Sequence, residues 1–302
     1  MAENSIRIDA LMPAEMAERA ETVGVKKAGL DFWTMFLLSV LAGAFIALGA
    51  VFSTTATAIT PGGAALPFGV GKVLGGLVFS LGLILVVVAG AELFTGNNLI
   101  VMAWASGKVT TAKLLRNWVI VYIGNFIGSV ITALLVLAAR QYMAGGGAIG
   151  LNALSIANAK VQLGFGQAIA LGILCNALVC LAVWLTFSAR STTDKILAII
   201  PPISAFVAAG FEHSIANMYF IPMGLLIKST AGPEFWASIG TTPADYPMLT
   251  WGNFFVRNLL PVTIGNIIGG ALLVGAVYWF IYLRKVEKPA PISAPAGAHG
   301  DD

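Results

Sequence analysis

The chain has 302 residues, of which 58% are hydrophobic and only 10% are charged. Soluble globular proteins carry about 25% charged residues, and the mean hydropathy of +0.88 shows that the polar cover of a soluble surface is missing. Aromatic residues make up 10% of the chain, which excludes a disordered, apolar-poor sequence. The composition therefore predicts an integral membrane protein.

A transmembrane helix needs about 20 mostly apolar residues. Six segments meet this requirement, and in chain order they are 32–53, 70–106, 114–139, 161–187, 195–227 and 255–283. The second and fifth are too long for one helix and are interrupted by polar residues. Each is predicted to form two half-helices joined by irregular backbone, which membranes tolerate only where protein buries it or where it lines a watery cavity. The fold class is thus an all-α membrane protein with spans 2 and 5 broken.

Two sequence patterns recur in the two halves of the chain. The frame R-N-x5-I-G-N-x-I-G begins at Arg116 and again at Arg257. A second frame, A-G-x-E-x4-N, begins at Ala89 and again at Ala209, inside the two interrupted segments. Each half then holds three spans, and because three is odd the second half enters the bilayer from the opposite side. The sequence predicts two inverted three-helix repeats, over about 32–140 and 160–283, with a substrate site near the midplane.

The basic residues indicate the orientation. With the N-terminus inside, twelve of the 17 basic residues fall in inside segments and five in outside segments, so the positive-inside rule places both termini in the cytoplasm. We expect a multi-pass protein of the cell inner membrane. Its parts are a cytoplasmic segment with a surface helix (1–29), one six-span channel domain (30–286) and a disordered cytoplasmic tail (287–302).

The polar residues within the spans are the candidate site. Glu92 and Glu212 are acidic residues at matching points of the two breaks, where a charge costs about 2.5–3.5 kcal/mol. We favour a structural role, in which each carboxylate accepts hydrogen bonds from backbone N–H groups freed by the break; a role in moving protons is the alternative. His213 is expected to line the path, with Asn217 on the same helix face and with Thr95 meeting it across the midplane.

Two further groups of residues lie within the predicted spans, namely large apolar side chains and two cysteines. The large apolar residues near the breaks form either plain core or narrow constrictions that exclude water; they are Phe79, Leu83, Phe94, Val179 and Phe206. Cys175 and Cys180 point about 140° apart on a helix, so neither a disulfide nor a metal site is expected from them. No metal or cofactor is predicted.

The residues around the breaks resemble the formate/nitrite transporter family, with most likeness to its formate channel branch. The likeness covers about 30–285 and is carried by Gly90-Ala91-Glu92-Leu93-Phe94-Thr95, by the nine residues from Gly210 to Met218, and by the two R-N frames. The resemblance implies an aquaporin-like fold assembled as a homopentamer with one pore per protomer. It also implies that the five apolar residues form constrictions, that Asn176 and Asn217 support the Thr95–His213 pair, and that Lys160, at the outer end of span four, draws anions toward the pore.

The expected function is a channel for small monovalent anions of weak acids, most of all formate, with pH-dependent permeation and protons as a second partner. Nitrite, hydrosulfide, acetate or lactate remain alternative substrates, because the family shares its pore motifs. A membrane enzyme using Glu92, Glu212 and His213 is the alternative from another class, but the sequence offers it neither a nucleophile nor a metal cluster. Nucleic acid is not an expected partner.

Overall fold

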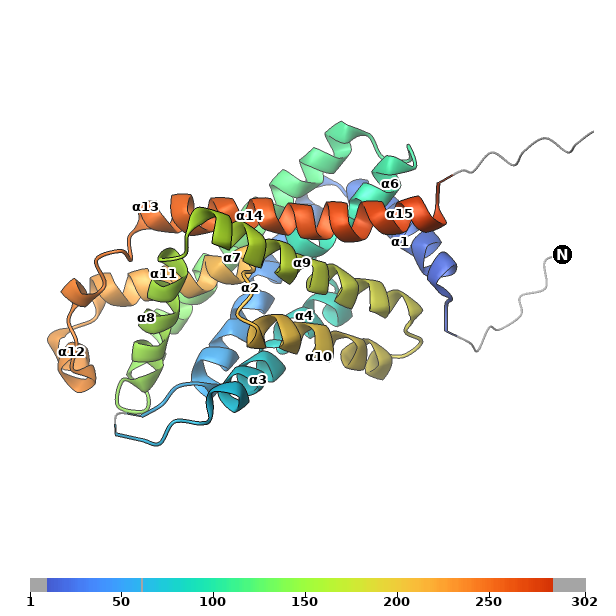
Figure 1. Ribbon diagram of the computed structural model, residues 1–302. Helices are drawn as coiled ribbons and strands as arrows, with labels where there is room; N and C mark the ends of the chain where they lie inside the picture. The colour runs from blue at the N-terminus through green and yellow to red at the C-terminus, as the bar shows by residue number, and fades with distance from the viewer. Residues whose placement is uncertain (1–9, 61, 285–302) are drawn as a thin grey trace, which may run out of the picture.

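The computed structural model describes residues 10–60 and 62–284, and all regular elements in those ranges are helical (Figure 1). Short π-helical segments, 85–90, 254–259 and 268–276, extend or join several helices. The helices are α1 Pro13–Ala28, α2 Phe32–Ala56, α3 Phe68–Phe79, α4 Leu81–Ile84, α5 Phe94–Asn97, α6 Val101–Ala105, α7 Thr111–Ala138, α8 Ala148–Val161, α9 Phe165–Ser188, α10 Thr192–Ala208, α11 Ser214–Thr230, α12 Pro233–Ile239, α13 Trp251–Asn253, α14 Leu260–Ile267 and α15 Val277–Tyr282. The predicted tail 287–302 and the first nine residues of the N-terminal segment lie outside the described residues.

Within the described residues, five helices are long and apolar enough to cross a membrane: Phe32–Ala56, Phe68–Gly90, Thr111–Ala138, Phe165–Ser188 and Trp251–Tyr282. They correspond to predicted spans 1, 2, 3, 4 and 6. The chain is therefore an all-helical protein with membrane-spanning helices. The fifth predicted span is represented by α10 and α11, of 17 residues each.

The two interruptions have the same backbone geometry. Gly90 and Gly210 adopt φ values of +82° and +73°, a conformation that glycine tolerates and that commonly ends a helix. After each glycine, the next N–H reaches back five residues, from Ala91 to the Val86 carbonyl at 2.9 Å and from Phe211 to the Phe206 carbonyl at 3.0 Å. Three residues of non-helical chain follow before a helix resumes at Phe94 or Ser214. Both predicted breaks are present.

The break in the second segment divides it unequally, which differs from the prediction of two half-helices, whereas the fifth segment is divided into two pieces of 17 residues each. The first piece of the second segment, 68–90, has 23 residues and is long enough to cross by itself. The following piece is short, consisting of α5, a 3₁₀ turn and α6. The structure also shows α8, a 14-residue helix before α9, in the segment between the third and fourth predicted spans, where the sequence analysis placed no helix.

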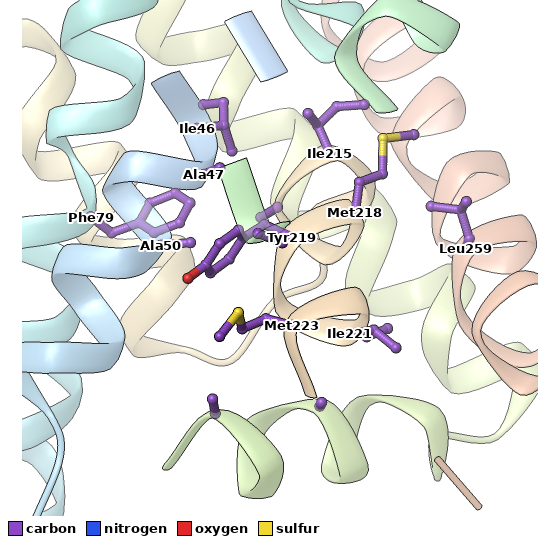
Figure 2. Close-up of a cluster of buried hydrophobic side chains, with 14 of the residues drawn as sticks. Ile46, Ala47, Ala50, Phe79, Ile215, Met218, Tyr219, Ile221, Met223 and Leu259 are labelled. Carbon is purple, nitrogen blue, oxygen red and sulfur yellow. The ribbon is translucent and has the colours of Figure 1, made fainter. Parts of the chain in front are cut away.

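Helix α11 is largely buried, since 12 of its 17 residues are buried. Figure 2 shows its side chains Ile215, Met218, Tyr219 and Met223 packed among residues of α2 and α3, including Ile46 and Phe79. An ordinary surface helix is apolar on one face. α11 is apolar on nearly all sides because α2, α7 and α8 surround it, and this fixes the polar residues at its first turn deep inside the protein.

Close helix contacts hold each half together. A Cβ on Gly128 of α7 would lie 1.9 Å from the carbonyl oxygen of Val40 in α2. In the other half, a Cβ on Gly269 would lie 2.2 Å from the carbonyl oxygen of Ile173 in α9. Only glycine permits two backbones to approach this closely. Small residues spaced four apart are known to favour helix association in membranes. These contacts place Asn125 of α7 and Asn266 of α14 beside the breaks.

Helix α1 packs against the body of the protein. Its residues Met16, Ala17 and Ala20 join the side chains of α9 and of the chain around α6 in an apolar cluster. The carboxylate of Glu21, 6% exposed, pairs with the ammonium of Lys108. The helix predicted for the N-terminal segment is present, and one face of it is buried.

Candidate functional site

A hydrogen bond between the two breaks forms the centre of the site. Thr95 Oγ1 lies 3.0 Å from His213 Nε2, and the two residues are 0% and 3% exposed. Thr95 is the second residue of α5, and His213 is the residue that precedes α11. The side chains that the sequence analysis placed opposite one another are therefore in direct contact.

The geometry around His213 assigns its protons. His213 caps helix α11, because its Nδ1 accepts a hydrogen bond from the backbone N–H of Ala216 at 3.0 Å. A ring nitrogen that accepts carries no proton, so in the neutral ring the proton is on Nε2. From this hydrogen-bond network we assign Nε2–H as the donor to Thr95 Oγ1. A proton on Nδ1 would break the cap. The site thus presents an N–H group at the start of a 17-residue helix, where the helix dipole favours an anion.

Glu92 is held by the side chains of two residues, which a third side chain, that of Asn117, connects to each other. The ammonium of Lys27, in α1, lies 2.6 Å from Glu92 Oε1, and the amide nitrogen of Asn97 donates to Oε2 at 2.7 Å. The same Asn97 amide donates to Oδ1 of Asn117 at 2.9 Å, and the Asn117 amide donates to the carbonyl of Lys27 at 3.2 Å. The ring of contacts joins α1, the first break and α7.

Glu212 has a closely similar set of partners. The ammonium of Lys160, in α8, lies 2.6 Å from Glu212 Oε1, and the amide nitrogen of Asn217 donates to Oε2 at 2.7 Å. The Asn217 amide also donates to Oδ1 of Asn258 at 2.7 Å, and the Asn258 amide donates to the carbonyl of Lys160 at 2.9 Å. Each contact repeats one made around Glu92. Both carboxylates are therefore neutralised and hydrogen-bonded, as buried charges require.

The donors to the two carboxylates differ from the sequence expectation. We expected backbone N–H groups freed by the breaks, whereas the described hydrogen bonds come from lysine and asparagine side chains. The freed N–H groups have other acceptors. The N–H of Phe94 donates to Asn125 Oδ1, and the N–H of Ser214 donates to Asn266 Oδ1, both at 2.9 Å. The second asparagines of the two repeated frames thus bind the breaks.

Asn176 and Asn217 bind different parts of the two breaks. The amide of Asn176 donates to the backbone carbonyls of Thr95 at 3.3 Å and Asn266 at 2.7 Å. Cys180 Sγ also lies 3.3 Å from the Thr95 carbonyl. Asn176 therefore fixes the backbone that carries Thr95, whereas Asn217 acts on Glu212, the residue before His213.

The five candidate constriction residues are all buried, with at most 3% of their surface exposed. Phe79 and Phe206 meet edge to face at 5.7 Å between ring centroids, and Phe206 stacks on His213 at 5.9 Å. Leu83 lies one turn beyond Phe79, and Phe94 directly precedes Thr95. Val179 belongs to the same cluster of buried side chains. The polar pair is thus enclosed by apolar side chains.

Two cavities approach the pair from different sides. The first, which we call the α1-side cavity, has a volume of about 550 Å³ and is lined by residues that include Leu83 and Leu93. The second, the α8-side cavity, has a volume of about 650 Å³ and is lined by residues that include Phe79, Phe206 and His213. Leu83 thus lines one cavity and the two phenylalanines line the other, whereas Phe94, Thr95 and Val179 line neither.

The two cavities differ in charge. Among the described residues, the α1-side cavity is lined by four cations and one carboxylate, namely Arg19, Lys26, Lys27, Lys195 and Glu92. The α8-side cavity is lined by two cations and one carboxylate, namely Lys72, Lys160 and Glu212. Both therefore carry net positive charge, which concentrates anions at their entrances.

Lys160 differs in place and in partner from the sequence expectation. It lies in the last turn of α8, not at the outer end of the fourth span. Its ammonium pairs with Glu212, so its field falls off faster with distance than the field of a single cation.

Sequence reasoning also missed Lys27 as the partner of Glu92. One signal was available: each buried carboxylate needs a nearby cation.

The comparisons with known proteins agree with one another. The model of the formate/nitrite transporter family matches residues 14–280. The formate channel FocA of Escherichia coli K12 is 51% identical over 277 residues, which cover 92% of this chain and 96% of that protein. FocA of Haemophilus influenzae is 45% identical over 266 residues, covering 88% and 93%. A solved structure described as a pentameric formate channel with formate bound superposes with a TM-score of 0.79 at 52% identity, covering 84% of this chain and 98% of that one.

These matches span nearly the whole membrane region, and they include both breaks and the central pair. The resemblance read from the sequence is thereby confirmed. The relatives are channels and transporters, not enzymes, which removes the membrane enzyme as an alternative. The chain belongs to the formate/nitrite transporter family.

Proposed function

We propose that this chain is the protomer of a homopentameric channel for formate, with one pore through each protomer. The likeness to FocA and to a pentameric channel with bound formate supports both the substrate and the assembly. The observation in the chain itself that carries the proposal is the Thr95–His213 hydrogen bond, which is enclosed by apolar side chains between two positively charged cavities. Nitrite and hydrosulfide have less support than formate, because the similar curated channels carry formate in their names.

The path runs from one cavity to the other past the central pair. Leu83 and Phe94 narrow it on the α1 side, and Phe79 and Phe206 narrow it on the α8 side. Val179 packs between them. Thr95 and His213 offer the polar groups at the middle. Asn176 holds the backbone of Thr95, and Asn217 binds the Glu212 carboxylate next to His213. Glu92 and Glu212 support the breaks, and Lys160 attracts anions over a short range.

A small anion crosses an apolar constriction only at high cost, since nothing there replaces its hydration. The positive cavities concentrate formate at each entrance. Within the constriction, the Nε2–H of His213 exchanges its hydrogen bond to Thr95 for a hydrogen bond to the carboxylate of formate. A proton that reaches the formate oxygen through water in the cavity lets the molecule cross as the neutral acid. Permeation then depends on pH, and protons travel with the substrate.

The matched contacts support an inverted repeat. Lys27, Glu92, Asn97 and Asn117 in the first half correspond to Lys160, Glu212, Asn217 and Asn258 in the second, contact for contact. The N–H of Glu92 donates to the carbonyl of Leu38 in α2, and the N–H of Glu212 donates to the carbonyl of Leu171 in α9. We infer six spans in an aquaporin-like arrangement, in which the second three-helix unit is turned over relative to the first.

The orientation follows from the distribution of charge. The α1-side cavity faces the cytoplasm, because helix α1 and the loops next to it hold most of the basic residues. Both termini then lie in the cytoplasm, and the protein spans the bacterial inner membrane. Residues 30–286 form a single channel domain, to which the helix of the N-terminal segment is docked.

The test is flux through the purified pentamer in proteoliposomes. Formate, nitrite, hydrosulfide and lactate are compared at external pH values from about 5 to 8, a range above the carboxyl pKa of about 4 in which neutral formic acid is the minor form and increases as the pH falls. We expect formate to pass fastest, with a rate that rises as the pH falls. His213→Ala should abolish the pH dependence, whereas the control Thr132→Val, distant in α7, should leave it unchanged. Unaltered formate flux in His213→Ala at every pH contradicts the proposed role of His213, and a wild type that excludes formate contradicts the substrate.

A further inference from the structure

The ring of Phe94 is enclosed from the side of α7. Phe94 is 3% exposed and begins the helix that follows the first break. Its ring meets the ring of Tyr122 edge to face, with 4.9 Å between centroids and 76° between planes. Trp118, one turn earlier in α7, meets it at 6.0 Å and 74°. The indole nitrogen of Trp118 also donates to the carbonyl of Asn97 at 3.1 Å. The position of the Phe94 ring therefore depends on α7.

Tyr122 is in turn fixed by the other half of the chain. Its hydroxyl oxygen lies 2.7 Å from Oγ1 of Thr263 in α14. The Thr263 hydroxyl donates its single hydrogen to the carbonyl of Leu259 at 2.7 Å, within its own helix. Thr263 Oγ1 is therefore the acceptor and the Tyr122 hydroxyl is the donor. This bond joins α7 to α14 directly behind Phe94.

The two bonded residues occupy the same place in the repeated frame. Tyr122 follows Asn117 by five positions, and Thr263 follows Asn258 by five positions. A contact between equivalent positions of two related units arises where the units meet at their two-fold axis. The Tyr122–Thr263 bond therefore lies beside the pseudo-two-fold axis that relates the proposed repeats. Movement of one half against the other is transmitted to the Tyr122 ring at this point.

We propose that Tyr122 is a positioning residue that sets the width of the constriction at Phe94, and that its bond to Thr263 holds it in place. The inference rests on the proposed function, because it concerns the selectivity of the same pore. Without the hydrogen bond to Thr263, the Tyr122 ring is free to tilt. The Phe94 ring, which packs against it, can then move away from the constriction. A wider gap admits monocarboxylates larger than formate. The bond thus contributes to the discrimination of substrates by size, although neither residue touches the substrate.

The experiment measures the ratio of formate flux to lactate flux in proteoliposomes. Tyr122→Phe keeps the ring and removes the donor, and Thr263→Val keeps the shape and removes the acceptor. Each should lower the ratio by about threefold to tenfold, the effect of one net hydrogen bond. The double variant should show no larger change than either single variant, because both remove the same bond. Thr263→Ser, which keeps the hydroxyl, should retain the wild-type ratio.

The control is Thr132→Val, in the same helix. Thr132 is a buried threonine whose hydroxyl donates to the carbonyl of Gly128 in its own helix. A purely structural role for Tyr122 predicts lower thermal stability at an unchanged flux ratio, and that result overturns the inference. A fall in the ratio for Thr132→Val, additive effects in the double variant, or loss of the pentamer in both single variants also overturns it. If the wild type carries no formate, the proposed function fails instead.

Discussion

The Lys160–Glu212 pair allows a quantitative prediction. At an effective dielectric constant of about 20, two unit charges 2.6 Å apart attract by about 6 kcal/mol, and the loss of hydration offsets part of this. Lys160→Gln leaves the Glu212 carboxylate, whose side chain is 5% exposed, without its cation. Removing one partner of a buried pair costs about 3–5 kcal/mol. Because Asn217 and Asn258 still donate to Glu212, we expect a loss of about 3 kcal/mol in the free energy of unfolding.

The assay is chemical denaturation of the detergent-solubilised protein, with formate flux measured in parallel. Glu212→Gln should cost less, since Lys160 is 16% exposed and reaches water in the α8-side cavity. The double variant, Lys160→Gln with Glu212→Gln, removes both charges at nearly constant volume and should recover most of the lost stability. Its flux should stay low if Lys160 also attracts formate. A Lys160→Gln protein as stable as the wild type, or losses that simply add in the double variant, would refute this reasoning.

Three further predictions concern packing, the second break and the α1-side cavity. Gly128→Ala places a Cβ 1.9 Å from the Val40 carbonyl oxygen and should cost at least about 1–3 kcal/mol, seen as an earlier thermal transition; an unchanged transition contradicts the close approach. Asn266→Leu leaves the Ser214 N–H without its acceptor, so it should lower the free energy of unfolding by about 1–3 kcal/mol and reduce formate flux. Normal flux in this variant would show that the second break keeps its conformation without Asn266. Lys195→Gln should slow formate entry about twofold from the α1 side at low salt only, because ions screen such charges within about 10 Å at 0.1 M; an equal effect at high salt rules out a long-range attraction.

The central pair could be predicted from the sequence because its signals are local. A run of polar residues after a glycine, inside a segment too long for one helix, indicates a break in an apolar span. Two such runs at matching places indicate that the breaks face each other. Thr95 and His213 are polar residues of those runs that can hydrogen-bond to each other across the gap, and the structure places them 3.0 Å apart.

The partners of the two carboxylates could not be predicted in the same way. Lys27 and Lys160 are 65 and 52 positions away from Glu92 and Glu212, and each lies on a helix outside the predicted spans. Their positions depend on how α1 and α8 pack, which no periodicity in the spans specifies. The resemblance implied that Lys160 draws anions toward the pore, and its ion pair with Glu212 became visible only in the fold. The unequal division of the second segment also depended on packing, not on hydropathy.

The two breaks have matching hydrogen-bond partners around their carboxylates, but they differ at the residues of the central pair. His213 is the last extended residue before α11, and the corresponding residue before α5 is Leu93. Thr95 is the second residue of α5, and the corresponding residue of α11 is Ile215. A pore with identical halves would conduct equally in both directions under reversed gradients. Here the imidazole belongs to one half and the hydroxyl to the other, so the proposed pore lacks the internal symmetry that would require equal conduction in both directions.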